Sequence, residues 1–395
     1  MQEYQERFFR ETPGSYFLFG PRGTGKTLWL RHHHADACRI DLLDSETYRT
    51  YVAHPEKIRD VLAGMPSGQT TVVLDEVQKV PALLDEVHQA ISQQAGKRFI
   101  LTGSSSRKLK RQGVDLLAGR AAVLTLHPFM GAELGARFDL LSALRWGMLP
   151  VVWGEEDRES ALGAYLTAYL REEIQQEGLA RNTGSFSRFL EAMSFSHGSL
   201  LNANEVAREC QVSRSTVEGY LSILEDLLLG FRLPVFKRRA TRQLTEHPKF
   251  YFFDCGVYRK LRPRGPLDRA DEVAGAALEG LVAQHLRAWI AYSQNDSTLH
   301  YWRTKSGAEV DFVIYGPNGF TAIEVKSSSR VERGDVRSLR TFQEDYPEAQ
   351  AILLYGGSQP LRVNDIPCLP CEDFLRNLKP GTDQAVNYGG VVYPQ

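Results

Sequence analysis

Gly20-Pro-Arg-Gly-Thr-Gly-Lys26-Thr27 is the stretch that decides the fold of the N-terminal part of this chain. It follows the apolar run Tyr16-Phe-Leu-Phe19, precedes a helical stretch and fits the pattern G-x-x-x-x-G-K-[ST]. The glycines let backbone N–H groups face phosphates, and the helix N-terminus adds its positive dipole end. We expect Lys26 to reach the phosphates of ATP and Thr27 to offer its hydroxyl to Mg²⁺. The residues assigned to this nucleotide site are Gly20, Pro21, Arg22, Gly23, Thr24, Gly25, Lys26, Thr27 and Leu28.

A pair of acidic residues ends the segment Thr71-Val-Val-Leu-Asp75-Glu76. The four residues before the pair favour a buried strand. We expect Asp75 to hold Mg²⁺ through water and Glu76 to orient and polarise the attacking water, because the metal and the nucleophile each need an acid. Downstream of the phosphate-binding loop, this pair predicts ATP hydrolysis.

Two further elements are candidates for the same site. Thr102 and Ser104 stand at a predicted strand end, where either could contact the γ-phosphate or the attacking water. Arg120 precedes another predicted strand and could act as an arginine finger on the ATP of a neighbouring subunit. The alternative for Arg120 is a solvated surface arginine. We interpret the run His32-His-His34 as a solvated helix end, because neighbouring helix residues point in different directions.

Length and composition favour a multidomain globular protein. The 395 residues suffice for two or three domains, and 43% hydrophobic with 24% charged residues is ordinary for a soluble protein. A net charge of -1 excludes a surface coated in positive charge, although a local basic face remains compatible with it. No stretch approaches the roughly 18 apolar residues of a membrane span, and we expect a cytoplasmic protein without a signal peptide or a membrane partner. We place Cys368 and Cys371 as thiols in a loop rather than as zinc ligands.

The chain divides into four sections by pattern. In residues 1–135 short β-rich runs alternate with helical stretches, which predicts a parallel sheet. Residues 136–245 are mostly helical, residues 246–380 read as a mixed α/β domain, and residues 381–395 form a tail.

A helix-turn-helix is predicted within the helical section. The spacing gives a helix from Ala203 to Cys210, a tight turn, and a second helix capped by Ser213. Arg214 is the residue of the second helix best placed to contact DNA. Basic residues follow where a wing would lie, and we expect phosphate contacts from Lys237, Arg238 and Arg239. Basic residues also cluster at 107–111 and 259–264. The alternatives are a solvated charged face and a packing or dimer element.

Several motifs together resemble one family. They are FLFGPRGTGKT, VVLDEVQKVP, FILTGSSS, LAGR, LHPFMGAEL, WGMLP, VSRSTVEGYLSILEDLLL and KFYFFDCGV. The set is similar to bacterial and archaeal AAA+ ATPases that join an AAA-type domain to the domain of unknown function DUF4143. The motif GMLP departs from the family, which usually has two glycines before this proline. The resemblance implies an AAA+ P-loop parallel-sheet domain, a winged helix in the helical middle section, and a restriction-endonuclease-like mixed α/β domain.

The C-terminal section carries an acidic pattern that such a domain would use. Asp311, Glu324 and Lys326 fit the D…E-x-K pattern of the PD-(D/E)xK nucleases, and Glu279 stands where these folds often carry an additional acid. Two carboxylates could bind Mg²⁺ while the lysine activates water. The alternative is an ordinary half-exposed strand with a cross-strand Asp–Lys ion pair.

Two functions fit these patterns best, and a plain Mg²⁺-dependent nuclease that ATP regulates is a third option. The first is a Mg²⁺-dependent AAA+ ATPase that binds and remodels DNA, with metal-dependent cleavage optional. The second is a nucleotide-switched interaction protein whose nuclease-like domain only binds DNA or a protein partner. In either case Arg120 acting in trans would require a homo-oligomer, for which a ring is one arrangement.

Overall fold

The computed structural model describes residues 4–93, 96–104, 119–170, 183–263, 265, 269–317 and 319–381. The chain divides into two compact units. The P-loop unit comprises residues 9–127 and 223–229, and the C-terminal unit comprises residues 1–8, 128–222 and 230–395. Among the described residues, no helix has both the length and the apolar character needed to cross a membrane.

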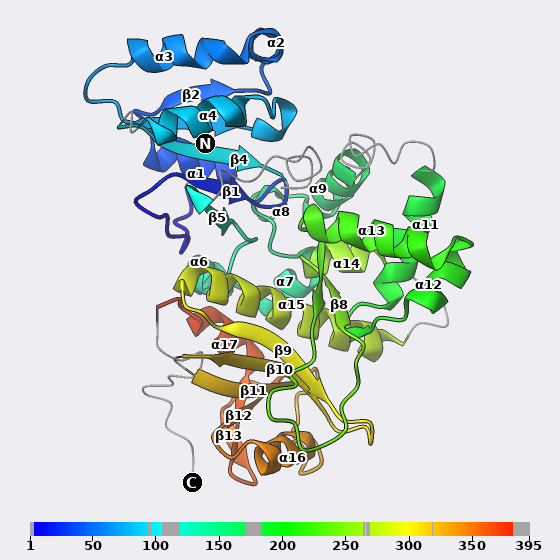
Figure 1. Cartoon of the computed structure of the whole chain (residues 1–395). Coiled ribbons are helices and arrows are strands. Elements are labelled where there is room, and N and C mark those ends of the chain that lie inside the picture. The colour runs from blue at the N-terminus through cyan, green and yellow to red at the C-terminus, as the bar shows by residue number, and fades with distance from the viewer. Residues whose placement is uncertain are drawn as a thin grey trace. The chain divides into compact units, whose positions relative to one another are not determined.

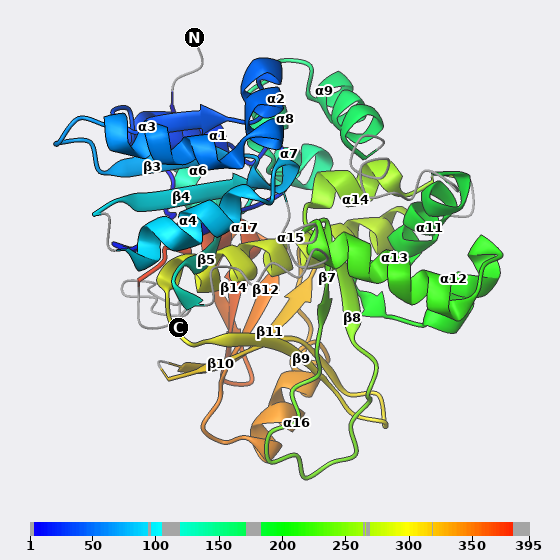
Figure 2. The same ribbon diagram turned by 45° about the horizontal axis from the view of Figure 1, so that its top comes forward.

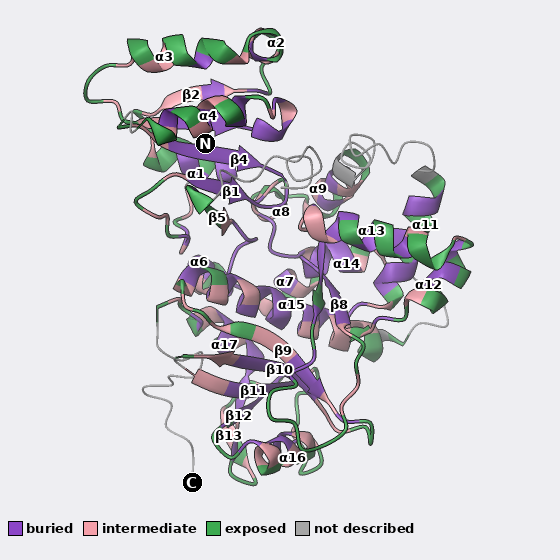
Figure 3. Cartoon of the chain, viewed as in Figure 1, coloured by how far each residue is buried: buried purple, intermediate pink, exposed green. Residues whose placement is uncertain are grey.

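A parallel sheet forms the centre of the P-loop unit (Figure 1). Its strand order is β2-β3-β4-β1-β5, and each neighbouring pair is parallel. The strands are β1 (Tyr16–Phe19), β2 (Cys38–Asp41), β3 (Thr71–Asp75), β4 (Arg98–Gly103) and β5 (Ala122–Thr125). Every residue of β1 is buried, whereas the edge strand β5 is exposed or half-buried (Figure 3). The predicted parallel sheet is therefore confirmed, and β1 has its predicted bounds.

Helices connect the strands of this unit (Figure 2). They are α1 (Lys26–His33), α2 (Ser45–Ala53), α3 (Ile58–Gly64) and α4 (Leu83–Ser92), with the short turns η1 (Pro55–Lys57) and η2 (Val77–Lys79). Helix α4 buries Leu83, Leu84 and Val87 on one face, at the spacing of an amphipathic helix. These side chains join the strand residues in one hydrophobic core.

Short helices begin the C-terminal unit. They are α6 (Gly131–Leu134), η4 (Gly135–Arg137), α7 (Leu140–Trp146), α8 (Pro150–Trp153), α9 (Arg158–Tyr165), the π-helical η5 (Leu166–Leu170) and α11 (Thr183–Phe195). Asp139 and Asp157 cap α7 and α9, because each carboxylate accepts a backbone N–H in the first turn. The predicted helical character of this section is confirmed in its described part, and residues 171–182 lie outside the described residues.

The predicted helix-turn-helix is present with its expected bounds. Helix α12 (Ala203–Cys210) ends at Gln211, whose φ of 54° reverses the chain, and α13 (Arg214–Asp226) follows. The Thr216 N–H donates to Ser213 Oγ over 3.1 Å, which is the predicted cap. A small antiparallel sheet in the order β6-β8-β7 accompanies these helices. Its strands are β6 (Ser199–Leu200), β7 (Gly230–Leu233) and β8 (Lys249–Phe252).

A mixed sheet in the order β13-β14-β12-β11-β10-β9 completes the unit. Its strands are β9 (Thr298–Arg303), β10 (Glu309–Gly316), β11 (Gly319–Lys326), β12 (Gln350–Tyr355), β13 (Leu361–Val363) and β14 (Ile366–Pro370). Strands β9, β10 and β11 are antiparallel neighbours, while β12 runs parallel to β11 and β14. The helices of this part are α14 (Cys255–Leu261), α15 (Ala270–Ser293), α16 (Arg337–Asp345) and α17 (Cys371–Asn377).

The core under α16 fixes one face of this sheet. Leu339 and Phe342 of α16 pack with Trp302 and Val313, and Phe236 from the segment between β7 and β8 joins the same cluster.

The placement of both cysteines of the CxxC pair in a loop was wrong. Cys368 lies in β14 and Cys371 begins α17, and both are fully buried. Their neighbours are apolar core, so both thiols serve packing.

Candidate functional site

The phosphate-binding loop leaves the carboxyl end of β1 and opens α1. Gly23 and Gly25 have φ angles of 81° and 92°, a left-handed conformation that favours glycine. A Cβ atom added at Gly20 would lie 2.4 Å from the Leu126 carbonyl oxygen. The glycines predicted from the motif are therefore required by the backbone path of this loop.

Lys26 and Thr24 bond to the carbonyl groups of their own loop. Lys26 Nζ donates to Gly20 O over 2.6 Å and to Pro21 O over 3.3 Å, and the side chain is buried. Thr24 Oγ1 donates to Pro21 O over 2.8 Å. The ammonium group thus lies within the curl of the loop, where phosphate oxygens can replace the carbonyl groups as its partners. By contrast, the side chains of Arg22 and Leu28 are exposed.

Thr27, Asp75 and Thr102 form one hydrogen-bonded set. Thr27 Oγ1 donates to Asp75 Oδ2 over 3.0 Å, and Thr102 Oγ1 donates to Asp75 Oδ1. Thr102 also accepts the Glu76 N–H over 3.1 Å. A hydroxyl and a carboxylate at this separation suit Mg²⁺, which prefers oxygen ligands and keeps several waters and substrate phosphates. The residues present therefore fit a magnesium nucleotide.

Glu76 is held by a residue that the sequence reasoning missed. Gln78 Nε2 donates to the Glu76 carboxylate and, over 3.3 Å, to Ser104 Oγ. Gln78 is buried, and a Cβ atom at Gly103 would lie 2.5 Å from its Oε1 atom. The signal in the sequence is a single amide two residues after the acidic pair. Of the two polar candidates at the end of β4, Thr102 contacts Asp75, whereas Ser104 contacts Gln78.

Arg120 is exposed at the start of β5, and its guanidinium contacts the His88 ring of α4. Its action as an arginine finger stays a prediction. The basic cluster at 107–111 lies outside the described residues.

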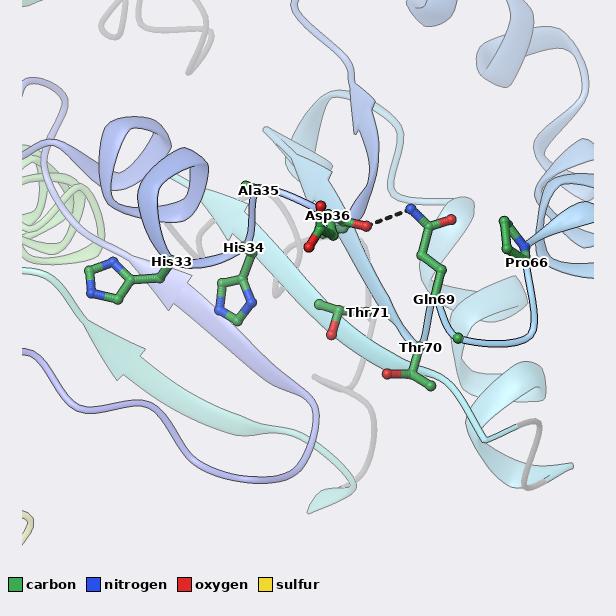
Figure 4. A pocket seen from close by; sticks show the side chains of 10 residues that line it. His33, His34, Ala35, Asp36, Pro66, Gln69, Thr70 and Thr71 are labelled. Carbon is green, nitrogen blue, oxygen red and sulfur yellow. Dashed lines mark hydrogen bonds between the residues drawn. The ribbon is translucent and has the colours of Figure 1, made fainter.

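A pocket lies at the amino ends of the strands of the same sheet (Figure 4). Its lining includes Ala37 and Thr71, which stand at the amino ends of β2 and β3, whereas the phosphate-binding loop follows a carboxyl end. His33 and His34 also line it, and Gln69 Nε2 donates to the Asp36 carbonyl across it over 2.6 Å. Because strands of a parallel sheet share one direction, this pocket is separate from the loop. Across the described part of the chain, no three His, Cys, Asp or Glu side chains are grouped to hold a metal.

The C-terminal unit brings Asp311, Glu324 and Lys326 together. Strands β10 and β11 pair with Phe312 opposite Ile323, and Asp311 Oδ2 accepts the Val325 N–H over 2.9 Å. Lys326 Nζ donates to Glu324 Oε1 over 2.6 Å. Burial, with Asp311 as a neighbouring like charge, raises the pKa of Glu324 well above its usual range.

Lys249 occupies the centre of this acidic cluster and was not identified from the sequence. Its Nζ lies 2.9 Å from Glu279 Oε1, 2.5 Å from Glu309 Oε1 and 3.1 Å from Asp311 Oδ1. The Tyr251 hydroxyl donates to Glu279 Oε1 over 2.6 Å. Burial and the nearby Asp311 raise the pKa of Glu279 to about 7. The only sequence signal was Lys249 opening an otherwise apolar strand.

The predicted DNA contacts lie in separate places. Arg214 is exposed at the first position of α13. The segment between β7 and β8 exposes Lys237, Arg238 and Arg239. It bridges to β9 through Val235–Tyr301 and to the residue after β9 through Leu244–Thr304. The Arg238 guanidinium lies 4.6 Å above the Tyr315 ring, and Arg242 pairs with Glu344 and Asp345. This basic segment therefore runs along the C-terminal sheet (Figure 1).

Family models match three successive parts of the chain. Residues 13–135 match an AAA domain, residues 137–268 match the domain of unknown function DUF8612, and residues 274–374 match DUF4143. The uncharacterized protein Rv2008c of Mycobacterium tuberculosis is 27% identical over 370 residues, which cover 91% of this chain and 80% of that protein. An uncharacterized protein of Haemophilus influenzae is 22% identical over 280 residues, covering 64% and 70% of the two chains.

The crystal structure of protein VC1899 from Vibrio cholerae covers 92% of this chain and 96% of its own. Its TM-score is 0.20 and its identity 14%, values too low to carry a structural argument.

Proposed function

This chain joins an N-terminal AAA domain to a C-terminal DUF4143 domain, and from that premise we propose that it is a Mg²⁺-dependent ATPase that acts on DNA. The observation that carries the ATPase proposal is the hydrogen-bonded set Thr27–Asp75–Thr102 beside Lys26 and Glu76. Each role that ATP hydrolysis needs has a residue in this set.

The contacts of each residue indicate its role in hydrolysis. Lys26, released from the carbonyl groups of its loop, stabilises negative charge on the transferred phosphoryl group. Thr27 and Asp75 would hold Mg²⁺, which when bound neutralises charge on the phosphates. Glu76 orients the attacking water and polarises its O–H bond. Gln78 fixes the direction of the Glu76 carboxylate, and Thr102 fixes that of Asp75.

Binding of DNA is supported by the order of the elements in the C-terminal unit. Helix α11, β6, α12, α13, β7 and β8 follow one another as in a winged helix. Helix α15, β9, β10, β11, α16 and β12 follow one another as in the restriction-endonuclease-like domain that the sequence resemblance implies. Exposed Arg214, Lys237 and Arg239 are the groups that would neutralise phosphates. We propose binding rather than cleavage as the role of this unit, because Lys249 already neutralises part of the acidic cluster.

The deciding experiment is steady-state ATP hydrolysis with Mg²⁺, measured alone and with single-stranded, duplex or branched DNA. Lys26→Ala serves as the blank. Stimulation by one form of DNA supports the proposal and identifies the substrate. A slow rate that no DNA changes contradicts it and favours a nucleotide-switched interaction protein.

Assembly belongs to the same proposal. If Arg120 acts on the ATP of a neighbour, active sites are complete only in a homo-oligomer. Light scattering with and without ATP measures the assembly. Mixing Arg120→Ala chains with Glu76→Gln chains then tests the direction of action, because a trans finger restores hydrolysis in mixed oligomers and a solvated surface arginine does not.

A further inference from the structure

Lys249 lies where the acidic cluster of the C-terminal unit would otherwise hold a metal. Its side chain is 2% exposed, and its ammonium is within 3.1 Å of three carboxylates that come from two elements, α15 and β10. An ammonium group has three donors, so these three acceptors account for all of them.

The groups around the ammonium are its three acceptors, the partners of those acceptors and one aromatic ring. Arg303 of β9 pairs with Glu309 over 2.8 Å, and Tyr251 of β8 donates to Glu279. The face of the Tyr301 ring lies 5.7 Å from Lys249 Nζ. The remaining acid, Glu324 of β11, pairs with Lys326. Three cationic groups, Lys249, Arg303 and Lys326, thus offset most of the charge of the four carboxyl groups before any ion enters.

A divalent ion does not fit this donor set as it stands. Of the three acids of the predicted metal site, Glu279 and Asp311 both direct an oxygen at the same ammonium, while Glu324 pairs with Lys326. A metal ion between them would lie within contact distance of Lys249 Nζ, and two cations so close inside a buried site repel strongly. Entry of the metal would require the ammonium to leave the three carboxylates that it now contacts.

We propose that the Lys249 ammonium is the resident cation of the cluster formed by Glu279, Glu309 and Asp311, in the place where a metal-dependent nuclease holds its divalent ion. The cluster is therefore closed to Mg²⁺ and Mn²⁺ in the native chain, and removal of the Lys249 charge opens a divalent-cation site. Since β8 also belongs to the sheet beside the helix-turn-helix, the same lysine ties that sheet to β10.

The test counts Mn²⁺ bound per chain by electron paramagnetic resonance, on full-length protein without nucleotide or DNA. We expect Lys249→Met to bind one Mn²⁺ more than the native chain, and Lys249→Met with Asp311→Asn to lose it. Lys249→Arg, which keeps the charge, should bind no more than the native chain. A folded Lys249→Met protein that gains no Mn²⁺ overturns the proposal.

A second comparison keeps Lys249 in place, so it does not depend on that variant folding. In the native background, Asp311→Asn should leave the Mn²⁺ count unchanged. Loss of a bound Mn²⁺ on this substitution would show that the native cluster already holds a metal, and would overturn the proposal. Because neither ATP nor DNA is present, failure here is distinct from failure of the proposed ATPase or DNA binding.

Discussion

Thr27 Oγ1 donates a hydrogen bond of 3.0 Å to Asp75 Oδ2 across 48 residues of sequence. Thr27 ends the phosphate-binding motif and Asp75 ends β3. The bond therefore joins two motifs whose contact the sequence alone does not show. The parallel sheet makes this contact, because the carboxyl ends of β1 and β3 share one edge. The predictions below start from this edge and then move to the C-terminal unit.

Replacing Lys26 by Ala should nearly abolish ATP hydrolysis. The substitution removes the one ammonium group inside the curl of the loop, and loss of a single group that stabilises developing charge costs about 10²–10³ in kcat. Release of phosphate from ATP measures the rate. Arg31→Ala, at an exposed position of the same helix, is the matched control and should keep the native rate.

Replacing Gln78 by Ala should lower kcat by about tenfold while leaving nucleotide affinity unchanged, because a carboxylate that has lost its fixed direction orients water less often. Gly103→Ala should act in the same direction by displacing Gln78. Turnover and binding of a fluorescent ATP analogue are measured separately. A change confined to affinity would mean that Gln78 shapes the nucleotide site rather than positions Glu76.

The basic segment between β7 and β8 should set the salt dependence of DNA binding. Lys237→Ala with Arg239→Ala removes two exposed charges, and each lost phosphate contact should reduce the slope of log K against log salt by about 0.9 on duplex DNA. Fluorescence anisotropy at several salt concentrations gives the slope. Arg49→Ala with Lys57→Ala, two exposed charges of the P-loop unit, is the control, and an equal effect there would refute a specific role for the segment.

Replacing Lys249 by Met should destabilise the C-terminal unit by about 3–5 kcal/mol, because the buried Asp311 and the half-buried Glu279 and Glu309 lose their shared partner. Urea unfolding followed by circular dichroism measures the change. Lys305→Met, at an exposed position of the same unit, should leave the midpoint where it is. Similar midpoints for the two variants would mean that the Lys249 ion pairs contribute no net stability.

Two buried histidines should each lower the stability of the C-terminal unit in acid, against the opposite contributions of Asp254, Glu279 and Glu324, whose pKa values are raised by burial. Burial lowers the pKa of His197 to about 3 and that of His285 to about 4. In the unfolded chain a histidine takes its proton near pH 6.5, so the unfolded state binds more protons between about pH 6.5 and pH 4. The stability that each neutral ring contributes is fully present above about pH 6.5. It is lost as the pH falls, by up to about 1.4 kcal/mol per pH unit for each ring.

His197→Gln checks this assignment, because glutamine offers an acceptor for the Phe252 N–H that now donates to His197 Nδ1 over 3.0 Å. Relative to the native chain, the acid-side slope of unfolding free energy against pH should fall by up to about 1.4 kcal/mol per pH unit in this variant, since His285 and the buried carboxyl groups retain their share. An unchanged slope would assign the acid sensitivity to other groups.

Prediction from the sequence was strongest where a local pattern has one structural solution. The glycines, Lys26 and the strand before them specify a loop geometry that few sequences share, and the Ser213 cap marks its helix within the chain itself. Prediction was weakest where a residue acts through distant partners. Gln78 stands in a turn of ordinary composition, and its hydrogen bonds to Glu76 and Ser104 depend on where β4 ends.

The sequence by itself determined the parallel sheet, the phosphate-binding loop, the acidic pair after β3 and the helix-turn-helix, because hydrophobic periodicity, glycine and helix caps act over a few neighbouring residues. Only the tertiary structure decided that Lys249 of β8 neutralises acids of α15 and β10, and that the basic segment runs along the C-terminal sheet. The charge of a lysine is evident in the sequence, but its electrostatic role depends on which carboxylates the folded chain brings within about 3 Å of it.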